Sequence, residues 1–216
     1  MSALDARFLR GALGNCIIGR EIVVLEETTS TNDSVLQRST SRTPEGLVVF
    51  AEHQTAGRGQ RDNRWESAPE KGLWLSILLR PKIDIAESAR LSSWAIRTVA
   101  ETIAREFGLA ARVKPPNDVY IGGKKVAGVL VEMRAQKNAP HLAIVGIGIN
   151  VNHRPEDFSE ELRARAASLS MLLDRSAKGR IRRGEEINRE AFAVALLREL
   201  DRTYRELFFC SASHSR

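Results

Sequence analysis

The chain has 216 residues, of which 43% are hydrophobic and 28% are charged. This length can bury one sizeable core, and no apolar run approaches the roughly 20 residues that span a bilayer. Residues 1–19 carry Asp5, Arg7 and Arg10 and contain no apolar stretch typical of a signal peptide. We therefore expect a soluble, cytoplasmic protein with neither a membrane anchor nor a secretory leader.

The charge balance and the two cysteines limit the kinds of partner and site that the protein can have. A total of 33 Lys and Arg against 27 Asp and Glu gives a formal net charge of +6. This favours anionic partners, without choosing among nucleotides, acidic proteins and nucleic acid. Cys16 and Cys210 lie near opposite ends of the chain and lack the spacing of a metal site or a redox pair. The basic cluster at 175–183 has no interleaved aromatic residues, so we expect it to be mainly a solvated loop.

Up to about residue 150 the chain alternates short apolar runs with polar turns. The β-branched and aliphatic runs predict strands at residues 22–25, 47–51, 73–79, 126–132 and 142–149. A short helix is predicted at residues 31–38, between the first two strands. Ser30 stands before its first turn and Asp33 follows three residues later, an arrangement that resembles a capping box.

Longer helical patterns follow the third strand and close the chain. Apolar residues recur at three- and four-residue spacing from Leu91 to Phe107, and Gly108 suits a C-terminal cap. Residues 160–174 and 185–207 are helical in composition and periodicity. Several strand pairs lie too close in sequence for helical crossovers. We therefore expect an α+β domain, with a mixed, largely antiparallel sheet and helices packed on one of its faces.

Residues 57–65 form the first segment that could carry chemistry. The sequence Gly-Arg-Gly-Gln-Arg-Asp-Asn-Arg-Trp follows a predicted strand and places two glycines beside three arginines. Glycines let backbone N–H groups approach an anion, and guanidinium groups add charged hydrogen bonds. A Gly- and Arg-rich surface turn explains the segment equally well, and no Walker-type ending follows.

Two later segments are ambiguous on their own. Residues 122–125 (Gly-Gly-Lys-Lys) predict a hairpin that leads two lysines into the next strand, where one could face a reacting phosphate. Taken alone, a solvated turn is the simpler interpretation. Residues 146–152 (Gly-Ile-Gly-Ile-Asn-Val-Asn) lack the third glycine and the helix of a dinucleotide fingerprint. Glycines within a strand indicate either close approach of a ligand or tight packing.

The order of these segments is more specific than any one of them. The chain carries Ser30-Thr31-Asn32, Gln54-Thr55-Ala56-Gly57-Arg58-Gly59, Lys114-x-Pro116-Asn117-Asp118, Lys125-x-x-Gly128-x-x-x-Glu132 and Gly146-x-Gly148-x-Asn150, in that order. From about Thr28 to Asn152 this pattern resembles the catalytic domain of biotin–protein ligases. The resemblance implies a fold similar to that of class II aminoacyl-tRNA synthetases. It also implies an enzyme that forms biotinyl-AMP from biotin and ATP, and then passes biotin to a lysine of an acceptor protein.

The resemblance also implies roles for individual positions. Catalytic roles are implied for Lys125, which would bridge the biotin carboxylate and the α-phosphate, and for Arg58 and Asp118. Asp118 could also orient or deprotonate the acceptor lysine. We assign biotin contacts to Ser30, Thr31, Asn32, Gln54, Gly57, Arg58, Gly59, Gln60, Lys125 and Gly128. Contacts with the nucleotide are assigned to Arg61, Trp65, Asn117, Asp118 and Asn150.

The implied ligands and partners follow from the same resemblance. ATP, Mg²⁺ and biotin are expected, with the metal held mainly by the ATP phosphates, so no metal ligands are named. The expected acceptor is a biotin carboxyl carrier protein or domain of a biotin-dependent carboxylase, and a homodimer is left open. We expect residues 1–207 to form the catalytic domain and 208–216 a short tail. Neither an N-terminal DNA-binding module nor a C-terminal small β-barrel is expected, and no DNA or membrane partner.

Two departures from the family pattern and two rival functions remain open. Pro115 stands where the family has tryptophan, and Asp62 stands where its loop has glycine, so Asp62 must avoid a positive φ or bear strain. A lipoate ligase or octanoyl transferase on the same fold is the nearest enzyme rival. A basic nucleic-acid-binding domain is the rival outside the enzymes, and it would bind with strong salt dependence and no need for ATP.

Overall fold

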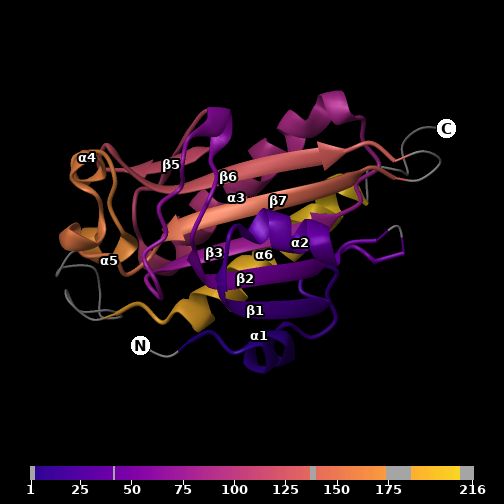
Figure 1. Cartoon of the computed structure of the whole chain (residues 1–216), viewed down its shortest axis with the longest axis horizontal. Helices are drawn as coiled ribbons and strands as arrows, with labels where there is room; N and C mark the ends of the chain where they lie inside the picture. The colour runs from indigo at the N-terminus through magenta and orange to yellow at the C-terminus, as the bar shows by residue number, and fades with distance from the viewer. Residues whose placement is uncertain (1–2, 41, 137–139, 174–185, 210–216) are drawn as a thin grey trace.

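A single mixed sheet of seven strands, in the order β1-β2-β3-β7-β6-β5-β4, forms the centre of the fold (Figure 1). The computed structural model describes residues 3–40, 42–136, 140–173 and 186–209. The strands are β1 Glu21–Thr28, β2 Leu47–Gln54, β3 Gly72–Leu79, β4 Arg112–Lys114, β5 Asp118–Ile121, β6 Lys124–Arg134 and β7 Leu142–Asn150. Strands β1 and β2 run parallel, and every other neighbouring pair is antiparallel. The predicted α+β class with a mixed, largely antiparallel sheet is therefore confirmed.

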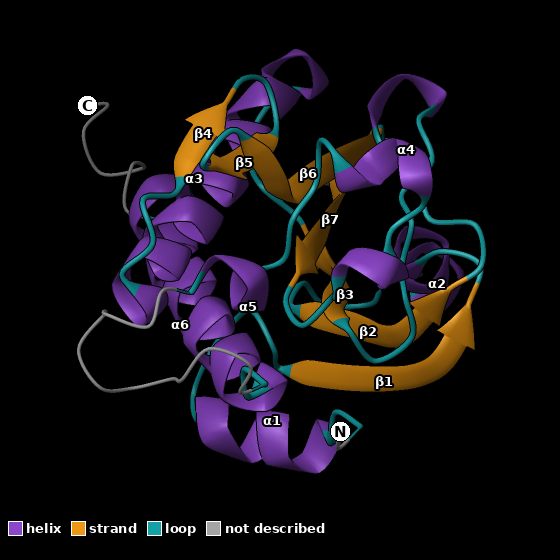
Figure 2. Cartoon of the chain, turned by 90° about the vertical axis from the view of Figure 1, so that its left-hand side faces the viewer, coloured by secondary structure: helices purple, strands orange, loops and turns teal. Residues whose placement is uncertain are grey.

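Helices lie on both faces of this sheet. They are α1 Ala6–Leu13, α2 Thr31–Arg38, α3 Ser88–Phe107, α4 Glu160–Arg163, α5 Leu169–Leu172 and α6 Arg189–Phe208, with 3-10 turns η1 Gln60–Asp62, η2 Ile85–Glu87 and η3 Pro155–Asp157. Figure 2 shows α3 and α6 on one side of the sheet and α2 on the other. The expectation that helices cover one face holds for the long helices and is wrong for α2.

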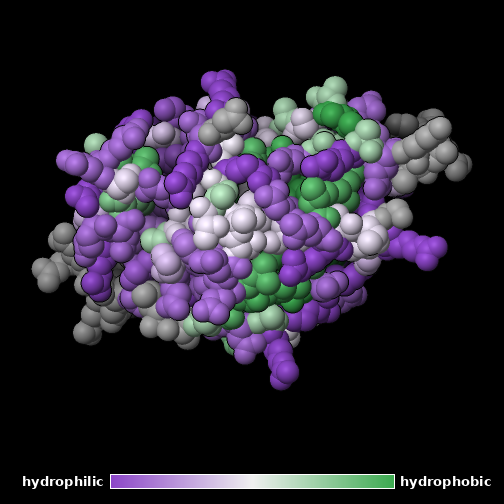
Figure 3. Space-filling view, viewed as in Figure 1, coloured by the Kyte–Doolittle hydropathy of each residue, from purple (hydrophilic) through white to green (hydrophobic). Residues whose placement is uncertain are grey.

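The placement of α2 follows from the pattern of apolar residues on the strands. The large core lies between the sheet and the two long helices, and it includes the inward side chains of Leu75, Ile77 and Val145. A second, smaller cluster joins Val35 of α2 to apolar residues on the opposite face, such as Val49. In Figure 3 hydrophobic residues gather over β1 and β2 beside α2, and again at the upper right over β6 and β7, in a surface that is otherwise largely hydrophilic. Helix α2 is therefore held by its own apolar contacts beside the sheet.

Two local features differ from the sequence-based expectations. Helix α1 was not predicted; Asp5 caps it by accepting hydrogen bonds from the N–H groups of Arg7 and Phe8. Residues 160–174 do not form one helix, because the backbone between α4 and α5 pairs with β6 through an Ala166–Lys125 bridge. Residues 174–185 and Cys210 lie outside the described residues, and with them the basic cluster at 175–183. Gly108 does cap α3 in the left-handed conformation, as predicted.

The capping box predicted at the start of α2 is absent. Ser30 occupies the N-cap position but makes no capping hydrogen bond through its side chain. The Asp33 carboxylate instead binds the guanidinium of Arg58, because an ion pair with two charged hydrogen bonds is stronger than a bond to a backbone N–H. The charge expected to start the helix is therefore used in a tertiary contact.

A buried ion pair joins the sheet to both terminal parts of the described chain. Arg189 donates to Glu52 over 2.6 Å, and their side chains are only 4% and 7% exposed. The second oxygen of Glu52 accepts from the backbone N–H of Leu4, and Arg189 also donates to the carbonyl of Gly72. This pair anchors the beginning of α6 against β2 and β3. No helix within the described residues is long and apolar enough to cross a membrane.

Candidate active site

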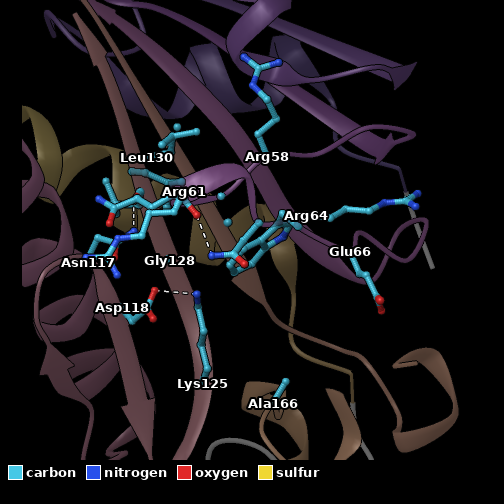
Figure 4. A pocket seen from close by; sticks show the side chains of 18 of the residues that line it. Arg58, Arg61, Arg64, Glu66, Asn117, Asp118, Lys125, Gly128, Leu130 and Ala166 are labelled. Carbon is cyan, nitrogen blue, oxygen red and sulfur yellow. Dashed lines mark hydrogen bonds and ion pairs between the residues drawn. The ribbon is translucent and has the colours of Figure 1, made fainter. Parts of the chain in front are cut away.

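A cavity of about 570 Å³ opens on the face of the sheet that carries α2. Its size lies within the range of small-molecule sites. The wall is formed by the start of α2, the end of β2, the loop 57–65, parts of β5, β6 and β7, and the segment that contains α4. Figure 4 shows the side chains from β5, β6 and the loop 57–65 gathered around this space. Segments far apart in sequence thus meet at one site.

One end of the cavity is built from uncharged polar side chains. The backbone N–H and the hydroxyl of Thr31 both donate to Oε1 of Gln54, over 2.9 and 3.1 Å. The buried hydroxyl of Ser76 lies 2.7 Å from the Thr31 hydroxyl and 2.5 Å from the Asn32 amide oxygen. Ser67 fixes the backbone of Gln54 by two hydrogen bonds of 2.9 Å. These contacts hold the amide and hydroxyl groups in fixed positions before any ligand arrives.

Asn32 connects this polar end to strand β6. Its amide nitrogen donates to Oε2 of Glu132 over 2.6 Å. Its side chain also lies flat against β7: a Cβ atom added at Gly146 would come within 2.4 Å of the Asn32 amide oxygen. The first glycine of the 146–152 segment is therefore required by packing against a polar side chain of the site.

The loop 57–65 folds into a small hairpin at the edge of the cavity. Arg58 and Arg64 pair as an isolated bridge, and the N–H of Trp65 donates to the Gly57 carbonyl over 2.9 Å. The positive φ in this loop falls on Arg61, at +56°, so Asp62 avoids it as its replacement of glycine requires. A left-handed conformation at a residue with a side chain costs on the order of 1 kcal/mol. The strained position of this loop is therefore Arg61.

Trp65 lies on a platform of two glycines. A Cβ atom at Gly148 would come within 2.6 Å of the Trp65 indole, and one at Gly128 within 2.9 Å. The ring also contacts Trp74 edge-on, with centroids 6.0 Å apart. The ambiguity of the glycines within β7 is resolved by packing: they make room for the side chains of Asn32 and Trp65, which both line the cavity.

A lysine and an aspartate form the charged end of the cavity. Nζ of Lys125 lies 2.6 Å from Oδ1 of Asp118, and the two side chains are 31% and 22% exposed. The same ammonium lies 5.1 Å from the centroid of the Trp65 ring, within the range of a cation–π contact. Figure 4 shows this pair facing the cavity. The hairpin at 122–125 therefore turns Lys125 inward, while Lys124 donates to the carbonyl of Arg163.

The backbone of Lys125 is fixed by the segment that contains α4. Its N–H donates to the carbonyl of Arg165 over 2.8 Å, and its carbonyl accepts from Ala167 over 3.0 Å. Asn150 supports the same segment, because its buried amide donates to the Ala167 carbonyl over 3.2 Å. Asn117 has a similar role on the other side and donates to the carbonyl of Val129 over 2.7 Å. The lysine thus projects from a well-supported stretch of chain.

A buried histidine lies behind the tryptophans. The ring of His153 stacks on Phe158 with centroids 4.9 Å apart, and it contacts Trp74 edge-on. Within the described residues its Nδ1 has no hydrogen-bond partner. Burial, and to a smaller extent the charge of Lys71, lowers the pKa of His153 to about 4, although Asp157 acts in the opposite direction. The ring is therefore neutral at physiological pH.

The structure brings most of the predicted site residues to one cavity. Its wall includes Ser30, Thr31, Asn32, Gln54, Arg58, Gly59, Gln60, Arg61, Trp65, Asn117, Asp118, Lys125 and Gly128. Gly57 and Asn150 are not part of the wall; both instead make hydrogen bonds that shape neighbouring segments. Sequence reasoning missed Ser76 and the segment from Glu161 to Ala166. Ser76 had a signal, since it is the one polar residue in the apolar run 73–79.

The described residues contain no group of three or more His, Cys, Asp or Glu side chains placed to hold a metal ion. The charged side chains that could approach a metal–nucleotide complex do not form a cluster of metal ligands. Asp118 lies on the cavity wall, and Arg61 and Arg64 of the loop also line it. Arginines placed in this way can form charged hydrogen bonds with phosphate oxygens.

Comparison with known proteins gives consistent matches. The biotin/lipoate A/B protein ligase family matches residues 24–150, more than half of the chain. The bifunctional ligase/repressor BirA of Bacillus subtilis is 34% identical over 198 residues, which cover 92% of this chain and 58% of that protein. The biotin–[acetyl-CoA-carboxylase] ligase of Mycobacterium tuberculosis is 34% identical over 165 residues, which cover 73% and 60% of the two chains. The chain thus spans somewhat more than half the length of these relatives.

A solved structure supports the same relationship. The biotin protein ligase of Aquifex aeolicus, solved in complex with biotin and ATP, superimposes with a TM-score of 0.71 at 29% sequence identity. The match covers 88% of this chain and 72% of that one. The arrangement of sheet and helices is therefore shared with a protein that binds both ligands.

Proposed function

Because the chain belongs to the biotin/lipoate A/B protein ligase family, we propose that it is an ATP-dependent biotin–protein ligase. Such an enzyme forms biotinyl-AMP and pyrophosphate, and then transfers biotin to one lysine of a biotin carboxyl carrier protein or domain. The observation that carries the proposal is the polarity of the cavity, which has fixed uncharged groups at one end and Lys125 at the other. Biotin has the matching polarity, with a ureido ring at one end and a carboxylate at the other.

In this proposal the ureido ring lies at the end formed by Thr31, Gln54 and Asn32. Amide and hydroxyl groups can both donate to the ureido oxygen and accept from its N–H groups. Because hydrogen bonds within the protein already fix these side chains, little conformational entropy is lost when biotin binds. Ser30, Gly59, Gln60 and Gly128 complete the biotin side of the wall.

The first step joins the biotin carboxylate to the α-phosphorus of ATP, and pyrophosphate leaves. Negative charge accumulates between the carboxylate and the phosphate oxygens as the new O–P bond forms. Lys125, on the cavity wall, would neutralise this charge, and Asp118 and Trp65 hold its ammonium in place. Arg61, also on the cavity wall, would approach the ATP phosphates, and Mg²⁺ brought with ATP would offset part of their charge. Correct positioning of the two substrates would supply much of the rate.

The second step transfers biotin from the mixed anhydride to the acceptor. The neutral ε-amine of the acceptor lysine attacks the biotinyl carbonyl carbon, the bond to the phosphate oxygen breaks, and AMP leaves. One proton of the amine must be removed in the process. Asp118 is the carboxylate on the cavity wall beside Lys125, so we propose that it orients the amine and accepts this proton.

Partner and compartment follow from the proposed reaction. The acceptor would be a carrier domain of a biotin-dependent carboxylase, since two of the relatives are named as biotin–[acetyl-CoA-carboxylase] ligases. We propose a cytoplasmic location, where ATP is abundant and thiols stay reduced. Cys16 is buried as a free thiol, which fits such a compartment.

The deciding experiment is biotin-dependent release of pyrophosphate from Mg-ATP, measured with biotin and with lipoate in parallel. Each reaction is then repeated with a purified biotin-acceptor domain. We expect release with biotin and label on one acceptor lysine. Release with lipoate alone would assign the chain to the lipoate branch of the family. Absence of release with both substrates would contradict the proposed ligase activity.

A further inference from the structure

The side chain of Arg58 turns away from the charged end of the cavity. Figure 4 shows its guanidinium pointing away from Lys125 and Asp118. Its two terminal nitrogens bind the two oxygens of Asp33 over 2.5 and 2.8 Å, which is the bidentate geometry of a strong arginine–carboxylate pair. One of these nitrogens also lies 3.4 Å from both oxygens of Glu132. One guanidinium therefore lies between two carboxylates from different elements.

These two carboxylates attach the loop 57–65 to the body of the protein. Asp33 lies in the first turn of α2, and Glu132 lies on β6, which borders the cavity. The hydrogen bond with Asp33 is the main cause that raises the pKa of Arg58 above its usual value. Beyond Arg58, the loop is held mainly by backbone pairs within its own hairpin and by the indole of Trp65 on its glycine platform. Arg58 is thus the loop's charged attachment to α2 and β6.

We propose that Arg58 is a positioning residue, which fastens the loop 57–65 over the cavity through Asp33 and Glu132. The part of this inference that concerns biotinyl-AMP rests on the proposed function. In the closed loop, Gly59 and Gln60 cover the ligand, and the Arg58 pair sets the rate at which the loop opens and the adenylate escapes. Asp33 is the principal anchor, because its two contacts are shorter than those of Glu132.

Glu132 links the loop attachment to the polar end of the cavity. The oxygen that faces Arg58 at 3.4 Å also accepts the amide of Asn32 at 2.6 Å. A ligand that draws the Asn32 amide toward itself would weaken this bond and leave more of the Glu132 charge for Arg58. Filling the cavity would then strengthen the attachment of the loop. Binding at the polar end of the cavity and attachment of the loop are therefore coupled through Glu132.

The attachment can be tested first without any ligand. The loop contains exposed trypsin sites at Arg61 and Arg64, and cleavage there requires the loop to open. We expect Arg58→Ala and Asp33→Asn to be cleaved about fivefold faster than wild type, as expected for loss of a half-exposed, bidentate ion pair. Glu132→Gln should have a smaller effect. The matched control is Glu27→Gln, which removes an exposed carboxylate paired with His53 on the neighbouring strands. Wild-type cleavage rates in both Arg58→Ala and Asp33→Asn would overturn the proposal.

A double-mutant cycle on the ligand then separates positioning from direct contact. Dissociation of biotinyl-AMP is measured in wild type, Arg58→Ala, Asp33→Asn and the double variant, with circular dichroism as a check of folding. If Arg58 acts through Asp33, all three variants release the adenylate faster by a similar factor, about fivefold to tenfold. Arg58→Lys should lie between, because it keeps the charge and loses the bidentate fork. Multiplicative effects in the double variant, or a normal Asp33→Asn enzyme beside an impaired Arg58→Ala enzyme, would mean that Arg58 contacts the ligand directly.

The two experiments distinguish the two possible failures. If wild type forms no biotinyl-AMP, the proposed function fails, and the trypsin result still decides whether Arg58 fastens the loop. If wild type forms the adenylate and the cycle is multiplicative, the ligase activity stands and the positioning role is wrong.

Discussion

Two ion pairs that involve strands of the same sheet are built in opposite ways. Glu52 and Arg189 are 7% and 4% exposed, and both Glu52 oxygens are bound within the protein. Asp118 and Lys125 are 22% and 31% exposed and face the cavity. Oδ1 of Asp118 has no well-directed hydrogen bond within the described residues, although the ammonium lies 2.6 Å away. Both carboxylate oxygens of the buried pair, which we call the saturated pair, have partners within the protein. The Asp118–Lys125 pair, which we call the open pair, can still form hydrogen bonds with a ligand.

The difference separates stability from function. A buried carboxylate and guanidinium that satisfy each other cannot exchange partners without a large cost, so they fix the position of α6. A partly solvated ammonium can leave its carboxylate for a phosphate at little cost, because water and the cavity compensate it. Substitutions in the open pair should therefore affect activity, and substitutions at buried positions should affect stability.

The largest expected effect is on activity, at the open pair. Lys125→Ala removes the ammonium that would neutralise the developing charge, so biotin-dependent pyrophosphate release should fall about a thousandfold, equivalent to about 4 kcal/mol. The melting temperature should change little, because the pair is partly exposed. Lys124→Ala is the matched control, since the side chain of the neighbouring lysine donates to the Arg163 carbonyl and makes no other polar contact within the described part of the chain. Normal pyrophosphate release by the Lys125 variant would remove this residue from the mechanism.

The saturated pair should show the opposite behaviour. Glu52→Ala leaves the buried charge of Arg189 without this carboxylate and the N–H of Leu4 without its acceptor. We expect the free energy of unfolding to fall by about 3–5 kcal/mol, measured by urea denaturation. Glu27→Ala breaks an exposed pair with His53 in the adjacent strand and should cost less than about 1 kcal/mol. Equal losses in the two variants would show that burial does not distinguish the pairs.

A third case is the buried His153, which has a neutral ring and makes no ion pair within the described residues, although the charge of Asp157 acts on it. Its pKa is lowered to about 4 in the fold, mainly by burial, and returns to about 6.5 on unfolding. Below about pH 6.5 the unfolded chain binds a proton that the folded chain excludes, so stability falls as the pH drops toward about 4. His153→Phe should retain the stacking and remove about 2–3 kcal/mol of the stability difference between about pH 7 and pH 4.5. Parallel pH profiles of wild type and variant would contradict this assignment.

The sequence predicted the elements that depend on local pattern. The five expected strands and the long helix α3 appear where apolar periodicity placed them, and Gly108 ends α3 as expected. The helix predicted at residues 160–174 is interrupted because the backbone at Ala166 pairs with Lys125, a residue distant in sequence that periodicity does not reveal. Asp33 failed as a cap for the same kind of reason, since its partner Arg58 lies on another segment. Long-range partners overrode both local signals.

The site was predicted mainly through the order of its motifs. The structure places Gln54, Lys125 and Asp118, which that order had grouped, on the wall of one cavity. The order of the motifs could not distinguish residues that line the cavity from residues that support the lining, and Asn150 belongs to the second kind. The glycines of β7 were ambiguous for a related reason. Whether a missing Cβ makes room for a ligand or for a side chain depends on contacts across the sheet, which the sequence does not record.

The glycines give the last and smallest prediction. At Gly148 a Cβ atom would come within 2.6 Å of the Trp65 indole, whereas at Gly11 in helix α1 nothing lies within 4 Å. Gly148→Ala should therefore destabilise the fold by about 2 kcal/mol through overpacking, and Gly11→Ala should stabilise it by about 0.5–1 kcal/mol through helix propensity.

Activity measurements distinguish whether the missing side chain at Gly148 makes room for Trp65 or for the ligand. Because the displaced indole lies 5.1 Å from the ammonium of Lys125, Gly148→Ala should lower kcat for adenylate formation as well as stability. Addition of Trp65→Phe to Gly148→Ala should then recover part of the stability, since the smaller ring leaves room for the new methyl group. If Gly148→Ala instead raises the KM for biotin while stability and kcat stay unchanged, the glycine makes room for the ligand and the packing explanation is wrong. In that case β7 would contact the ligand directly, and Gly148 would belong with Lys125 and Asp118 to the ligand-binding part of the sheet.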